Sequence, residues 1–365
     1  MEEEKLSQRD AAFPAEAIEG TYGGYIRHKR LVMAGLAVAV AVLGLASLSI
    51  GSFQLGPADI LAGLFGQADE QVNRVVQGMR LPRVLTAIVA GIALALAGCA
   101  YQATLRNPLA SASTLGIAQG AAFGASLAII VFAGGAAGAA AYEGVAMGDP
   151  FLTAACAFVG AMASTAVILG LSRFREMGPE SIVLLGVALS ALFTAGTALV
   201  QYFAEDSQVA AVVFWTFGDL SRVTGLQLAI MAAVTAAAAV FFCCNRWNYN
   251  AIESGEGVAH GLGVSVDTVR LASMVVASAA AATVIAFCGT INFIGLVAPH
   301  IMRRLLGADY RYLLPASALA GAAVLLVADG LCHIIVAPLI LPISAITSIV
   351  GAPLFIWLLF KGVRR

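Results

Sequence analysis

The sequence predicts an all-α polytopic membrane protein with about ten transmembrane helices, and its composition and the length of its apolar segments support this. Of the 365 residues, 60% are hydrophobic and only 11% are charged, whereas an average soluble domain is about 25% charged. The apolar residues gather in segments of about 20, enough for an α-helix to cross a hydrocarbon core of about 30 Å. The 38 glycines fit this class, because small residues let membrane helices approach closely.

Residues 1–30 form a polar tail that begins "MEEEKLSQRD" and ends "RHKR". The apolar run that follows lies too far from the terminus for a cleaved secretory signal. We therefore predict a cytoplasmic N-terminal tail over 1–30 and a ten-helix membrane domain over 31–365.

Ten apolar segments, separated by polar residues or by glycine and proline, give the predicted spans. The eighth is short and contains Pro299, so it decides on which side of the membrane the C-terminus lies. The segments are 31–50, 82–102, 114–135, 150–171, 181–203, 225–244, 268–288, 293–306, 313–333 and 344–361.

The basic residues test this arrangement. With the N-terminus in the cytoplasm, sixteen of the 20 lie in cytoplasmic segments or at cytoplasmic span ends, and only Arg74, Arg80, Arg83 and Arg222 lie outside. The positive-inside rule predicts this asymmetry. Nine crossings would place the C-terminal "KGVRR" outside, so we expect ten crossings and two cytoplasmic termini.

Such a bundle is a transporter, a channel, an intramembrane enzyme or a receptor, and several chemistries lack their residues here. A P-loop needs a lysine after a glycine, but none of the three lysines follows one. The six cysteines form no C-x-x-C pair, and the four histidines have no metal-ligand spacing. The spans also lack the paired carboxylates or nucleophile–base pair of an enzyme. We therefore expect no catalytic residue, metal or cofactor in this chain, and ATP-driven work would need a partner.

Asp329 and His333 lie four residues apart on one face of the ninth span. Buried acids and histidines are the coupling sites of ion-driven transporters, so an ion-coupled secondary transporter is the alternative function. His333 falls at the outer end of its span, which favours a structural pair or a surface contact.

The segment 245–267, "NRWNYNAIESGEGVAHGLGVSVD", is too polar to cross the membrane and too long for a tight turn. Its pattern predicts a short helix over 250–256, a turn, and a second helix around 258–262. A solvated loop is the alternative interpretation. A structured pair would dock a soluble subunit.

Several long stretches together resemble the permease subunits of type II ABC importers, which carry iron–siderophore complexes, haem and vitamin B12. The resemblance covers about residues 50–363. Its motifs are "RLPRVLTAIVAGIALALAGCAYQATLRNPLA" (80–110), "LLGVALSALFTAG" (184–196), "SGEGVAHGLGV" (254–264), "FIGLVAPHIMRRLLGADYRYLLPASALAGAAVLLVAD" (293–329) and "LPISAITSIVGAPLFIWLLFKG" (341–362).

The resemblance implies a multi-pass subunit of the bacterial cytoplasmic membrane with the type II permease fold. The implied partners are a second permease subunit, as a homodimer or a related pair, two cytoplasmic ABC ATPases that bind the ATP, an extracytoplasmic binding protein, and membrane lipid, but no nucleic acid. The spans offer almost none of the ligands that a bare metal ion would need. A preformed chelate is therefore the expected cargo, with iron–siderophore and haem ahead of cobalamin.

The resemblance also implies site residues. By matching position, Asn107, Pro108 and Leu109 would form the cytoplasmic gate, with Pro108 ending the helix, Asn107 bonding freed backbone groups and Leu109 supplying an apolar plug. A simple helix-breaking turn is the alternative.

Two further groups of residues follow from the same resemblance. Gly255, Glu256, Ala259 and Gly263 match the helices that couple the permease to its ATPases.

Arg80 and Arg83 match arginines that dock the binding protein, although lipid-phosphate contact would also explain them. His333 stands in place of a third docking arginine, and Ile340 in place of an acidic residue.

Overall fold

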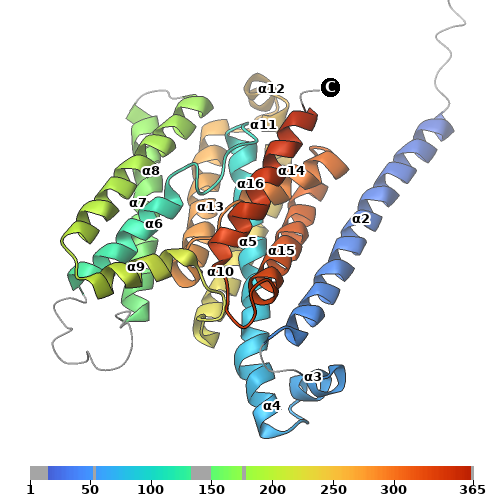
Figure 1. Cartoon of the computed structure of the whole chain (residues 1–365). Helices are drawn as coiled ribbons and strands as arrows, with labels where there is room; N and C mark the ends of the chain where they lie inside the picture. The colour runs from blue at the N-terminus through green and yellow to red at the C-terminus, as the bar shows by residue number, and fades with distance from the viewer. Residues whose placement is uncertain (1–14, 52–54, 133–148, 175–177, 363–365) are drawn as a thin grey trace, which may run out of the picture.

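A computed structural model describes residues 15–51, 55–132, 149–174 and 178–362, and within them the regular elements are helices, with no β-strand. Figure 1 shows the helices packed side by side around α5, with α2 leaning against one flank. The predicted all-α class is confirmed.

Each of the ten predicted spans corresponds to a helix. Among the described residues, seven helices are long and apolar enough to cross a membrane, and α6–η2 and α16 are shorter apolar helices. Helix α14, the eighth predicted span, has 13 residues and belongs to neither group, so its crossing stays a prediction. The elements are α2 (Ala15–Ser49), α5 (Leu81–Thr104), α6 (Ile117–Ser126) continued by η2 (Leu127–Phe132), α7 (Pro150–Phe174), α8 (Pro179–Tyr202), α10 (Gly225–Cys244), α13 (Val266–Cys288), α14 (Ile294–Leu306), α15 (Tyr310–Ile334) and α16 (Ile343–Gly362).

The predicted boundary at residue 30 falls inside a helix, because α2 begins at Ala15. No proline interrupts residues 15–49, so the helix continues from the polar segment into the apolar one. By hydropathy the candidate membrane span within it is Ile26–Ser49. Residues 1–14 of the predicted tail lie outside the described residues.

Four short elements were not predicted. They are α3 (Pro57–Leu64), α4 (Glu70–Val75), η1 (Val76–Arg80) and α9 (Asp206–Phe217). At 12 residues, α9 is too short to cross a membrane, and it packs against α6, η2 and α16.

The predicted pair of short helices in segment 245–267 is present as α11 (Arg246–Glu253) and α12 (Glu256–Gly261). The first helix begins four residues earlier than predicted, because Tyr249 and Ile252 bury one face of it. The solvated-loop interpretation is therefore wrong.

The centre of the bundle is α5, which packs against α15, α13, α14 and α10. Two glycine pairs allow this close packing. A Cβ at Gly98 would lie 1.7 Å from the carbonyl oxygen of Gly295, and one at Gly91 would lie 2.5 Å from that of Gly321. Small residues are therefore required where α5 meets α14 and α15.

One end of the bundle, the α12 end, gathers α11 and α12, the end of α5, and the starts of α13 and α15 (Figure 1). The chain also enters α2 and leaves α16 at this end. An even number of crossings places both ends of the helical bundle on the same side, and the ten-span prediction requires this.

Candidate functional site

The loop of residues 105–116, here called the gate loop, joins α5 to α6 at the α12 end. Helix α5 ends at Thr104, and Arg106 adopts a left-handed conformation with φ 45°. The N–H of Asn107 then donates to the carbonyl oxygen of Gln102 over 3.3 Å, which closes the helix terminus. The prediction that Pro108 ends the helix is wrong, because the chain has already left the helix before Pro108.

The predicted gate residues lie together at the turn of this loop. Asn107 Oδ1 accepts a hydrogen bond from the N–H of Leu109 over 2.9 Å, which is a bond within the loop and not to a backbone group at the end of α5. Pro108 is exposed, and Leu109 is 39% exposed. An apolar side chain held outward by a rigid turn suits contact with another molecule, and the gating role stays a prediction.

The residues matched to ATPase coupling lie on α12 and its two flanking turns. Gly255 and Gly263 have φ values of 123° and 81°, conformations that favour glycine. Ala259 is fully buried against the chain itself, in a small apolar cluster with Ile252 and Val266. Ala259 therefore holds α12 in place and cannot face a partner directly.

The outward face of α12 carries residues that the resemblance did not select. Val258 is 52% exposed and Leu262, the residue that follows the helix, is 69% exposed. His260, Gly257 and Gly261 are also exposed. These five residues, the α12 face, present a small apolar surface at the tip of the molecule. The burial of Ala259, together with the exposure of these five residues, shows which side of the helix faces outward.

Helix α11 is anchored to the bundle through Glu253. Its carboxylate accepts from Arg303 Nη1 over 2.7 Å and from the Tyr310 hydroxyl over 3.2 Å. Asn250 Oδ1 accepts from the N–H of Tyr310 over 2.9 Å. Charge-assisted hydrogen bonds are among the stronger ones, so these contacts hold α11 against α14 and the start of α15.

Asp309 caps the start of α15 beside this anchor. Burial would raise the pKa of Asp309, but hydrogen bonds from Arg311 and Asn250 lower it to about 2. Asp309 is therefore ionised at neutral pH. Its negative charge at the N-terminus of α15 stabilises that helix.

At the opposite end, Arg80 and Arg83 are buried. Arg80 Nη1 donates to the carbonyl oxygen of Leu48 over 2.7 Å, and Arg83 Nη2 donates to that of Ser47 over 2.9 Å. The last carbonyls of a helix lack partners within it, so both arginines cap the C-terminus of α2. Docking of a binding protein by these residues stays a prediction, and the structure shows an internal role for both.

Asp329 and His333 also contact Arg83. Arg83 Nε lies 3.3 Å from Asp329 Oδ2, and both side chains are almost fully buried. Arg83 Nη1 lies 2.8 Å from His333 Nε2, and His333 Nδ1 lies 2.9 Å from the carbonyl oxygen of Asp329. One neutral tautomer satisfies both contacts, since Nε2 accepts and Nδ1–H donates. The geometry therefore favours the structural-pair interpretation over a proton relay.

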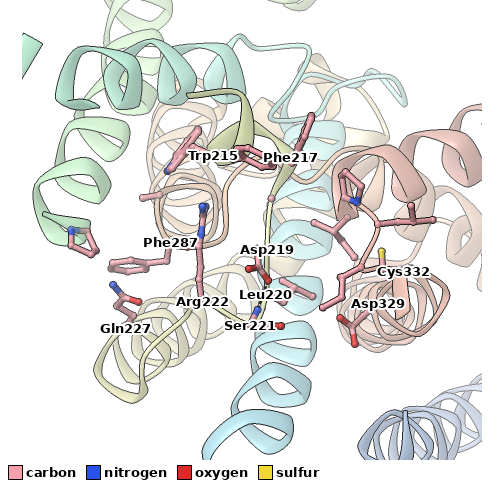
Figure 2. Close-up of a pocket in the computed structure, with 18 of the residues that line it drawn as sticks. Trp215, Phe217, Asp219, Leu220, Ser221, Arg222, Gln227, Phe287, Asp329 and Cys332 are labelled. Atoms are coloured by element: carbon pink, nitrogen blue, oxygen red, sulfur yellow. Dashed lines mark hydrogen bonds between the residues drawn. The ribbon is translucent and has the colours of Figure 1, made fainter. Parts of the chain in front are cut away.

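A cavity of about 610 Å³ opens beside this cluster, and Figure 2 shows its lining. The wall comes from α9 and the turn after it, from the starts of α7, α10 and α16, and from the ends of α13 and α15 with the residues that follow α15. Aromatic side chains dominate one wall, among them Trp215, Phe217 and Phe287. Sequence reasoning missed this cavity, because its residues converge only in three dimensions.

The charged side chains that line the cavity are Asp219, Arg222 and Asp329, and His333 lies beside them. Arg222 donates from Nε to the carbonyl oxygen of Phe287 over 3.0 Å, and its guanidinium carbon lies 5.8 Å from the centre of the Trp215 ring. Asp219 Oδ1 accepts from the N–H of Ser221 over 2.7 Å. Ile340, which stands in place of an acidic residue, also lines the wall. The lining suits a large, partly apolar solute.

A helical bundle with a cavity at one end and a pair of short helices at the other is an arrangement that suits a multi-pass membrane permease. The chain belongs to the FecCD transport family, whose pattern matches residues 36–361. The predicted family is thereby confirmed.

Individual relatives match over most of their length. An ABC transporter permease protein of Methanocaldococcus jannaschii is 44% identical over 344 residues, covering 94% of this chain and 98% of the relative. The hemin transport system permease of Yersinia pestis is 32% identical over 332 residues, covering 91% and 96%. The vitamin B12 import system permease of Salmonella paratyphi A is 33% identical over 329 residues, covering 90% and 94%.

A solved structure of an inward-facing metal-chelate type ABC transporter aligns with a TM-score of 0.78 at 28% identity, covering 91% of this chain and 99% of the other. The predicted fold of a type II ABC importer permease is confirmed.

Proposed function

We propose that this chain is the membrane-spanning subunit of an ATP-driven importer that moves a metal chelate from an extracytoplasmic binding protein into the cytoplasm. The observation that carries the proposal is the match, over at least 90% of the chain, to relatives named for transport of hemin, Fe(3+)-citrate and vitamin B12. Iron–siderophore complexes and haem are the preferred cargoes, and cobalamin is the third.

The proposed partners are a second copy of the permease, two ABC ATPases on the cytoplasmic side and the binding protein on the other. The chain has no P-loop lysine, so ATP hydrolysis must occur on the ATPases. The α12 face, with Val258 and Leu262 exposed, supports docking of a soluble subunit. We expect the α12 end, and with it both termini, to lie in the cytoplasm.

The cavity supports a chelate as cargo. Among the described residues there is no group of three or more histidine, cysteine or acidic side chains that could hold a metal ion. A bare ion needs such ligands in place of its water, whereas a chelate brings its own. The aromatic wall around Trp215 and Phe217 (Figure 2) suits the organic part of such a complex.

Co-purification tests the proposal. The full-length chain would be expressed in a host that also carries the neighbouring ATPase and binding-protein genes, and the complex would be isolated in mild detergent. We expect a P-loop ATPase to co-elute with the permease in equal numbers. A permease that elutes without any ATPase, and that accumulates solute on a proton gradient alone, would instead support the ion-coupled alternative with Asp329 and His333.

A further inference from the structure

Arg270, in the second turn of α13, binds three elements with one side chain. Its Nη2 is ion-paired with Glu256 Oε1, at the first residue of α12. Its Nε donates to the carbonyl oxygen of Thr104, the last residue of α5, over 3.1 Å. Its Nη1 contacts Asp267 Oδ1 on α13 itself over 3.3 Å. The side chain is only 13% exposed.

The two distant contacts join the proposed ATPase-docking helix, α12, to the residue that precedes the gate loop. Glu256 opens α12, whose exposed face would meet the ATPase. Thr104 is followed directly by the gate loop, in which Asn107 and Leu109 form the turn. A guanidinium therefore spans from the docking helix to the residue before the gate.

The chemistry of this contact makes it a stiff connection. The guanidinium is planar, and its N–H groups have fixed directions. Because Nε and Nη2 belong to one rigid plane, a displacement of the Glu256 carboxylate relative to the Thr104 carbonyl strains or breaks one of the two bonds. The carbonyl of Thr104 is also one of the terminal groups of α5 that lack a partner within the helix.

We propose that Arg270 is a positioning residue that transmits the movement of α12 to the gate loop. This inference rests on the proposed function, because it takes α12 as the ATPase docking site, and on the predicted gating role of Leu109. Movement of α12 on ATP binding would shift the end of α5 through Arg270 and so change the path that Leu109 takes in the gate.

The connection is tested in the reconstituted complex with Arg270→Gln, which removes the charge and the fork. We expect the ATPase to remain bound and to hydrolyse ATP, while solute moved per ATP falls at least about tenfold, the effect of losing one charge-assisted hydrogen bond. In the variant Leu109→Cys, the yield of crosslink between two permease copies would measure how often the gate is closed. Its nucleotide response should be lost in Arg270→Gln.

Two further variants separate transmission from simple stabilisation of α12. Glu256→Gln, at a residue that is 42% exposed, should uncouple in the same direction. The double variant should be no worse than Arg270→Gln alone, because Arg270→Gln already removes the ion pair with Glu256. The charge swap Glu256→Arg with Arg270→Glu restores the ion pair, but a carboxylate cannot donate to the Thr104 carbonyl. Coupling should therefore stay low in the swap.

Asp267→Asn is the matched control, because Asp267 contacts Arg270 but is 92% exposed and links no second element. Its uptake per ATP should equal that of the wild type. Full coupling in Arg270→Gln and in Glu256→Gln, or full rescue by the charge swap, would overturn the proposed transmission. A wild-type complex without ATP-dependent uptake would overturn the proposed function itself and the inference with it.

Discussion

Arg83 shows that the position of a residue in the sequence does not give all of its contacts. Its place at the start of a span suggested a surface contact, yet its side chain lies inside the chain and contacts Ser47, Asp329 and His333. Reversing its charge would disturb these contacts as well as any docking. A weakened capture of the binding protein by such a variant would therefore not by itself assign Arg83 to docking.

Replacing Arg83 with glutamine should destabilise the protein by about 3 kcal/mol, because it leaves the buried carboxylate of Asp329 without its cation. Thermal unfolding in detergent measures the effect. Arg83→Gln combined with Asp329→Asn should recover part of the loss. The control is Arg74→Gln, whose ion pair with Glu70 is exposed and should contribute no resolvable stability. Equal, small losses in both single variants would contradict the buried-pair account.

At the scale of elements, α12 is organised as an inner side and an outer side. The inner side is Ala259, packed on Ile252 and Val266, and the outer side carries Val258 and Leu262. A large residue at position 259 would displace the helix from within. A charge at position 258 or 262 would change only the outward surface.

The two sides predict different defects. Val258→Asp and Leu262→Asp should each weaken ATPase binding at least about tenfold, as expected for apolar anchors at a protein interface, with normal thermal stability. Ala259→Trp should lower the stability of the permease itself. Affinity for the purified ATPase, measured beside Thr268→Asp at an exposed position on α13, distinguishes the cases. Unchanged affinity in both aspartate variants would remove the docking role from the α12 face.

The gate loop makes a second prediction for an element. Leu109→Cys should crosslink between two permease copies when the inner gate is closed, and ATP should change the yield. Leu109→Ala should make the resting pore leakier to small solutes, because it reduces the apolar plug. Pro108 and Leu109 are both exposed, so the crosslink needs no unfolding. A cysteine that never crosslinks in any nucleotide state, together with a tight alanine variant, would show that the loop is only a turn.

The elements also show how far sequence reasoning reached. The long spans were predictable because membrane thickness sets a length and a hydropathy that any window detects. Helices α3, α4 and α9 were missed because short helices carry no such signal. Sequence motifs predicted the positions of the gate loop and of α12. The inward direction of Ala259 and the burial of Arg80 were not predictable, because both depend on neighbours distant in sequence. The cavity is lined by segments from α7 to α16 that meet only in the fold, so no local pattern pointed to it.

At the scale of the whole molecule, the features proposed to act in transport lie at two opposite ends of the bundle. The cavity lies at the ends of α13 and α15, while α12 and the gate loop lie at their starts. Helices α2 and α8 are the most open to the surroundings, with only 17% of their apolar windows buried. A transport cycle must connect these two ends, and α5, which packs against α13 and α15, runs between them to the gate loop.

The most direct test of this account is uptake by proteoliposomes that contain the permease with its ATPase. Haem, ferric citrate, a ferric hydroxamate and cobalamin would be offered in turn with the binding protein outside and ATP inside. We predict that one of these chelates accumulates only with hydrolysable ATP and the binding protein, and that collapsing ion gradients has no effect. Accumulation that needs a proton or sodium gradient and ignores ATP would contradict the account.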